Sequence, residues 1–198
     1  MSTFLVILIA AGVFVYLLIS SNKANEKQKE LLQTQAEKRG GQLDASSSNL
    51  LLQVGNLILQ ICPIPSRKGV PAETHAVLGA QSIEELVKER SRFPKITIVS
   101  DTWLQNSTAP NGHTRVLFGD EKFDKAFIVY GENEADVRRV LTDEIRQKLS
   151  ALLPKSPFLK THPDSTSTTF FSTVGVINNS EGYDLYIDTI VSILTNLA

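Results

Sequence analysis

Three histidines are the side chains of this 198-residue chain best suited to acid–base or metal chemistry. His75, His113 and His162 lie far apart in the sequence, and no HExxH, HxH or paired-cysteine spacing connects them. Zinc sites that can be recognised from sequence depend on such short spacings. A metal site would have to be assembled entirely by the fold, and we predict no metal ligand. We expect His113, in an NGH segment, and His162, in a THPD segment, to lie at exposed turn positions.

Cys62 is the only cysteine, so the chain has no internal disulfide. It lies in the apolar run LILQIC, where a small buried hydrophobic residue is the expected role and a nucleophile is the alternative. No GxSxG elbow and no glycine-rich phosphate loop of the GxxxxGK or GxGxxG type occurs. The sequence therefore predicts no catalytic residue, no cofactor-binding residue and no cofactor.

Carboxylates occur in adjacent pairs, for example Asp120 with Glu121. Acids at a helix start usually interact with the helix dipole, and acids in turns are usually solvated. Asp101 follows a predicted strand, a position where catalytic residues often occur, and Trp103 lies just beyond it. We expect a packing role for the tryptophan, and we predict that none of these acids is a general acid or base.

The charged residues nearly cancel: 20 basic and 21 acidic side chains give a formal net charge of −1. Strong nucleic-acid binding requires a basic surface, which this composition does not provide. We therefore predict no nucleic-acid partner, and no motif predicts a small-molecule ligand.

Residues 4–19 form the clearest feature of the chain, sixteen apolar positions without a charge. With the flanking Thr3, Ser20 and Ser21 the segment has about 19 residues, enough for a helix to cross a hydrocarbon core of roughly 30 Å. A cleaved signal peptide is the alternative, but the basic n-region is missing. A buried soluble helix is a third reading, but the run has no polar face. We predict an uncleaved transmembrane anchor over residues 1–21.

Lysines indicate the orientation of this anchor. Lys23, Lys27 and Lys29 follow the apolar run, whereas the residues before it carry only the α-amino group. Basic residues near a span stay on the cytoplasmic side, which predicts a cytoplasmic C-terminal domain. Many short bacterial anchors send their domains outward, so an extracytoplasmic domain in a secretion or pilus assembly is the alternative.

The remaining sequence predicts a helical stalk over residues 22–41, ending at Gly40-Gly41, and one α+β domain over 42–198. Gly55-Asn56 predicts a hairpin, and Ser82 with Glu85 predicts a capping box. Irregular interleaving of strands and helices favours mainly antiparallel strands with a few packed amphipathic helices. The expected strands cover 50–54, 57–62, 70–78, 95–100, 116–118, 126–130, 158–162 and 168–177; the expected helices cover 82–90, 133–153, with a possible restart at Thr142, and 187–197.

Residues 119–153 resemble a segment of an uncharacterised family of bacterial membrane-anchored proteins. The matching positions are Phe123, Asp124, Phe127, Val129, Leu141, Arg146 and Leu149. The resemblance implies an architecture and membrane attachment, and no activity. We expect Phe123 and Phe127 to anchor the core, Asp124 to cap the turn between them, and Arg146 to pair with an acid on a neighbouring element.

Together these features predict a single-pass membrane protein with a non-enzymatic α+β domain that binds a protein partner or organises a membrane complex. Two alternatives stay open. One is a membrane-tethered hydrolase that uses a histidine and a carboxylate brought together by folding. The other is the inner-membrane component of a secretion or pilus assembly.

Overall fold

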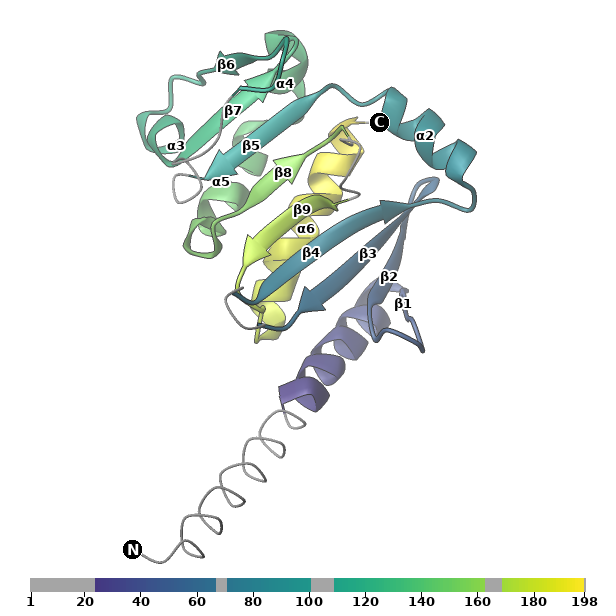
Figure 1. Ribbon diagram of the computed structural model, residues 1–198. Coiled ribbons are helices and arrows are strands. Elements are labelled where there is room, and N and C mark those ends of the chain that lie inside the picture. Colours follow the sequence, from purple (N-terminus) through teal and green to yellow (C-terminus); the bar gives the residue numbers. More distant parts are fainter. Residues whose placement is uncertain (1–23, 67–70, 101–108, 163–168, 198) are drawn as a thin grey trace, which may run out of the picture.

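The computed structural model of the chain describes residues 24–66, 71–100, 109–162 and 169–197 (Figure 1). They contain a nine-stranded sheet with the order β1-β2-β3-β4-β9-β8-β5-β7-β6. Every pair of neighbouring strands is antiparallel. The predicted α+β class with antiparallel strands is thus confirmed. The predicted anchor over 1–21 lies outside the described residues, and no helix within them is long and apolar enough to cross a membrane.

The elements follow the predicted order, but some ends differ: α6 begins at Ser180, seven residues before the expected start at 187, and β6 covers 114–116 in place of 116–118. The strands are β1 (Gln42–Leu43), β2 (Leu50–Val54), β3 (Leu57–Ile64), β4 (Glu73–Gly79), β5 (Ile96–Ser100), β6 (Thr114–Val116), β7 (Phe127–Gly131), β8 (Phe158–Lys160) and β9 (Thr169–Val174). The helices are a helix over 24–39, called the N-terminal helix below, α2 (Ile83–Ser91), α3 (Glu121–Ala126), α4 (Glu134–Val140), α5 (Asp143–Ala151), the short 3-10 helix η2 (Leu153–Lys155) and α6 (Ser180–Leu197).

Local capping explains where the helices begin. The Ser82 hydroxyl accepts a hydrogen bond from the Glu85 amide at 3.1 Å and starts α2, as the capping box predicted. The expected helix over 133–153 is divided, because Leu141 leaves helical geometry and Thr142 caps a second helix, α5. The restart at Thr142 is therefore the correct alternative.

Three short elements were not predicted: α3, β1 and the 3-10 helix η2. The turn expected around Phe123 contains the helix α3, whose start is capped by the Asp120 carboxylate through the amides of Lys122 and Phe123, both at 3.1 Å. The strand β1 has two residues and pairs with the start of β2. None of these segments is long enough to show a hydrophobic period.

One face of the sheet is covered by helices (Figure 1). The N-terminal helix, α4, α5 and α6 all lie on this side, and β3 shows the resulting pattern. Leu57, Leu59 and Ile61 are buried, whereas the residues between them are half-buried. Because side chains alternate along a strand, the odd-numbered residues of β3 enter the core and the even-numbered ones point to the other side.

The opposite side of β2, β3, β4 and β9 has no described helix over it (Figure 1). We call this surface the open sheet face. The register brings Cys62 opposite His75, and Ile64 opposite Glu73. The half-buried residues of the open sheet face are Leu51, Ile58, Gln60, Cys62, Ile64, Glu73, His75, Val77, Ser172 and Val174.

Tyr186 of α6 connects this helix to the middle of the sheet. Its fully buried hydroxyl donates to the carbonyl oxygens of Thr74 on β4 at 3.1 Å and Phe171 on β9 at 3.4 Å. Burial raises the pKa of Tyr186 well above its ordinary value, so the phenol keeps its proton and remains a donor. The helix is thereby placed beneath the strand pair that joins the two halves of the sheet.

The two faces of β3 predict different responses to truncation. Leu59→Ala removes a fully buried side chain, and we expect it to lower the free energy of unfolding by about 2–5 kcal/mol. Ile58→Ala, one residue away on the open sheet face, should cost less than about 1.5 kcal/mol. Urea unfolding of the full chain in detergent, followed by circular dichroism, measures both. Equal losses would contradict the assignment of the two faces.

Candidate functional site

The N-terminal helix is packed against the rest of the domain. Leu32 and Ala36 are buried, and both belong to the hydrophobic core formed with the sheet and α6. The helix ends in a Schellman motif, in which the Gly41 amide donates to the Ala36 carbonyl at 2.8 Å and Gly40 has a φ of +65°. The predicted break at Gly40-Gly41 is confirmed. The helix that follows the predicted anchor in sequence is thus an integral part of the fold.

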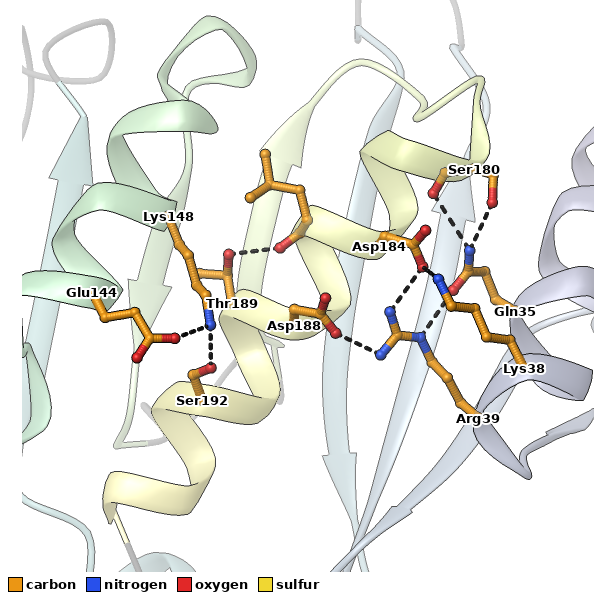
Figure 2. A network of polar contacts seen from close by, with 11 residues as sticks. Gln35, Lys38, Arg39, Glu144, Lys148, Ser180, Asp184, Asp188, Thr189 and Ser192 are labelled. Carbon is orange, nitrogen blue, oxygen red and sulfur yellow. Dashed lines mark hydrogen bonds and ion pairs between the residues drawn. The ribbon is translucent and has the colours of Figure 1, made fainter.

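The N-terminal helix meets α6 in a set of polar contacts, called the junction below, and Arg39 makes the central one (Figure 2). Its guanidinium binds two carboxylates of α6, Asp184 at 2.9 Å and Asp188 at 2.6 Å. Lys38 adds a second ion pair to Asp184 at 2.7 Å. The Arg39 and Asp184 side chains are only 18% and 27% exposed, so the pair that they form is better shielded from water than an ordinary surface ion pair.

Gln35 completes the junction from within. Its side chain is fully buried, accepts a hydrogen bond from Arg39 Nε at 2.9 Å, and donates to the Ser180 hydroxyl at 3.2 Å. Gln28 forms a further hydrogen bond to the hydroxyl of Tyr183. Polar side chains of the N-terminal helix therefore meet α6 in specified pairs, which fix how the two helices are aligned.

A second polar contact holds α6 from its other side (Figure 2). Lys148 of α5 binds Glu144 on its own helix at 2.7 Å and donates to Ser192 of α6 at 2.8 Å. The C-terminal helix is therefore held between the N-terminal helix and α5.

The protonation state of Asp184 is coupled to this junction. The hydrogen bond from Lys38 lowers the pKa of Asp184 most, burial opposes this change, and the hydrogen bond from Arg39 lowers the pKa further. The pKa of Asp184 therefore lies below its ordinary value of about 4, and the carboxylate is charged at neutral pH.

His75 lies beside a carboxylate, as the hydrolase alternative requires. Its ring forms a close contact with Glu73 on the same strand, and both side chains are about one-fifth exposed. Cys62 lies directly opposite His75 in the register of β3 and β4. The expectation that Cys62 is buried is wrong, because it is half-buried on the open sheet face. Partial burial still raises the pKa of the Cys62 thiol, which works against thiolate formation.

The other two histidines meet at one end of the sheet. The rings of His113, before β6, and His162, after β8, are 5.1 Å apart between centroids. Both are half-buried, which corrects the expected exposure of these two side chains. Nearby, Lys95 and Glu132 form an ion pair at 2.7 Å, and its hydrogen bond lowers the pKa of Glu132. In the described part of the chain, no group of three histidine, cysteine or acidic side chains is placed to hold a metal ion.

The residues that carry the family resemblance are mainly structural. Phe123 and Phe127 are buried with ring centroids 4.8 Å apart, as expected. Asp124 accepts hydrogen bonds from the amides of Phe118 and Gly119, both at 2.9 Å, and so caps the turn before α3 rather than the expected turn between Phe123 and Phe127. The expected partner of Arg146 is wrong: it pairs with Asp143 on its own helix, at 2.5 Å.

Arg146 also stacks on an aromatic ring. Its guanidinium carbon lies 4.5 Å from the centroid of the Phe118 ring. This cation–π contact, rather than an acid on another element, connects α5 to the segment before α3. Asp101 and Trp103 lie outside the described residues.

Comparison with known proteins assigns no family. No family model matches the chain, and no curated protein matches it. A crystal structure of the mycobacterial trehalose monomycolate transport factor A, TtfA, is similar with a TM-score of 0.48 and 10% sequence identity, over 86% of this chain and 94% of that chain. At this level the similarity assigns neither a family nor a function. The resemblance of residues 119–153 to a membrane-anchored family stays a prediction.

The lowered pKa of Asp184 predicts an acid-sensitive junction. A carboxylate with a depressed folded-state pKa stabilises the fold above its unfolded pKa, and this contribution is lost as the pH falls through the folded pKa. Asp184→Asn should lower the melting temperature at pH 7, and the difference from the unaltered chain should shrink as the pH falls below about 4. Thermal unfolding over this pH range measures it. Glu30→Gln, an exposed change on the N-terminal helix, is the control; a pH-independent difference at Asp184 would contradict the assignment.

Proposed function

We propose that the chain is a single-pass membrane protein whose α+β domain binds a protein partner without catalysis and thereby organises a membrane complex. The open sheet face is the observation that supports binding of a protein partner. Ile58, Val77 and Val174 are apolar and solvent-accessible there, among polar side chains. A surface that mixes apolar and polar groups in this way is typical of protein interfaces.

The membrane attachment rests on the apolar run over residues 4–19. The junction supports a role for this anchor beyond simple retention. Arg39 and Gln35 fix the N-terminal helix to α6, and this helix begins only five residues after the apolar run, at Ala24. This short separation in sequence keeps the open sheet face near the bilayer. The lysines after the run favour a cytoplasmic domain.

Site-specific photocrosslinking in cells tests the partner. Benzoylphenylalanine replaces Ile58 or Val77 on the open sheet face, or Gln147 on the exposed side of α5 as a control. We expect one and the same membrane-complex protein to be captured from both sheet positions and not from Gln147. Capture from all three positions, or from none, would count against the proposal.

The same cells report the orientation. A phosphatase that is active only outside the cytoplasm, fused after Ala198, should be inactive if the domain is cytoplasmic. An active fusion would favour the alternative of an extracytoplasmic domain in a secretion or pilus assembly.

A membrane-tethered hydrolase is the second candidate, favoured by one observation. Cys62 lies opposite His75, which contacts Glu73, so a nucleophile, a base and an orienting acid share one surface. The raised pKa of Cys62 argues against an activated thiolate. The thiol should titrate above the usual value of about 8.5 for cysteine.

Alkylation kinetics distinguish the two candidates. Because Cys62 is the only cysteine, the mass added by iodoacetamide reports on this side chain alone. Non-enzymatic binding predicts slow labelling at pH 7, a pH midpoint above that of free cysteine, and the same midpoint in His75→Gln. A midpoint below that of free cysteine that rises in His75→Gln would show an activated nucleophile and favour the hydrolase.

A further inference from the structure

A pocket of about 740 Å³ lies at the end of the domain where the N-terminal helix begins. The first turns of this helix, the end of β3 and the segment after β9 come together at this end (Figure 1). Leu31 and Leu32 contribute apolar surface from the helix, and Pro63 and Val176 contribute it from the other elements. The volume lies within the range of roughly 300–1,000 Å³ that is usual for ligand sites.

The lining of the pocket is amphipathic. Asn25, Gln28 and Asn178 add polar groups to the apolar residues. Lys27 and Lys29 also line it, both are exposed, and neither forms an ion pair with another described residue. Lysine side chains can bury their methylene groups along apolar surface and keep the ammonium in water. This combination suits a ligand with a long apolar part and an anionic head.

The pocket is also close to the predicted anchor in the covalent chain. Ala24, the first described lining residue, is five residues beyond Ile19, the last residue of the apolar run. Even fully extended, these residues span at most roughly 18 Å. One leaflet of the hydrocarbon core is about 15 Å thick, half of the whole. The pocket edge at Ala24 is therefore separated from the end of the apolar run by a distance comparable with the length of one acyl chain.

We propose that this pocket holds an acyl chain of an anionic membrane phospholipid, with the phosphate near Lys27. The proposal rests on the membrane anchor proposed above, and it goes beyond that function by assigning a ligand. Apolar surface from Leu31 and Val176 would cover the chain. The phosphate would gain the attraction that basic side chains near a membrane surface have for anionic lipids. Glu26, which also lines the pocket, would remain at the water side of the headgroup.

Tryptophan quenching by brominated lipid tests the proposal on the full chain. Trp103 is the only tryptophan, so Trp103→Phe gives a silent background for Leu31→Trp inside the pocket. Gln33→Trp, two residues along the same helix and exposed outside this pocket, is the matched control. The variants are reconstituted in vesicles of phosphatidylcholine and phosphatidylglycerol, with bromine on the acyl chains of the phosphatidylglycerol only. We expect Leu31→Trp to lose most of its fluorescence and Gln33→Trp to keep it.

Each other outcome overturns the proposal in a recognisable way. Equal quenching of both tryptophans would mean that the whole helix start lies in the bilayer. If neither tryptophan is quenched in chains that float with the vesicles, the proposed lipid site is wrong, whereas the proposed anchor is supported. If the chains do not float with the vesicles, both the proposed anchor and the proposed lipid site are wrong.

A second tryptophan position tests whether the result at Leu31 depends on a disturbed fold. Val176→Trp examines the pocket from a different element and should be quenched in the same way. In the Leu31→Trp chain, adding Val176→Glu places a charge against the acyl chain and should restore the fluorescence. Circular dichroism verifies that each variant is folded, and persistent quenching in the Val176→Glu chain would contradict the site.

Discussion

The burial of α6 beneath the sheet is the interaction on which the other parts of the structure depend. Its Tyr186 hydroxyl binds carbonyl groups of both β4 and β9, and these two strands join the first four strands to the remaining ones. Arg39 holds the N-terminal helix to one side of α6, and Lys148 of α5 binds the other. Because α6 (Ser180–Leu197) follows all nine strands of the sheet in the sequence, the sheet and both neighbouring helices obtain their common partner only when residues 180–197 are in place.

The junction with the N-terminal helix uses polar contacts where apolar packing alone would allow sliding. Leu32 and Ala36 supply the apolar contact, but the hydrophobic effect has no direction and specifies alignment weakly. Gln35 is fully buried and engages both Arg39 and Ser180, so a shifted helix would leave buried polar groups without partners. Such a loss costs about 1–3 kcal/mol for each group. The register of the helix along α6 is therefore set by hydrogen bonds, and its affinity for the domain is set by burial.

The sequence predicted those features that local residues encode. The hairpin at Gly55, the cap at Ser82 and the possible break at Thr142 depend on neighbouring residues, and all three occur. The contacts of Gln35 and Arg39 could not be predicted, because their partners are about 145 residues away and a polar helix face usually indicates exposure. The pairing of Cys62 with His75 likewise depends on a register that only the assembled sheet defines. The contact of Arg146 with the Phe118 ring was not predicted, because the positive charge of arginine suggested an acidic partner.

The two proposed ligands use separate parts of one fold. The lipid pocket is lined by a helix start and by segments at strand ends, whereas the open sheet face is formed by strand interiors around Ile58 and Val77. The two surfaces share none of the residues that define them, so a bound acyl chain does not occupy the place of a protein partner. They are nevertheless connected through one rigid element. Leu31 lines the pocket and Arg39, two turns further along the same helix, binds α6, which underlies the sheet. Lipid at the membrane end and protein at the sheet can thus be held in a fixed relative position by a single domain.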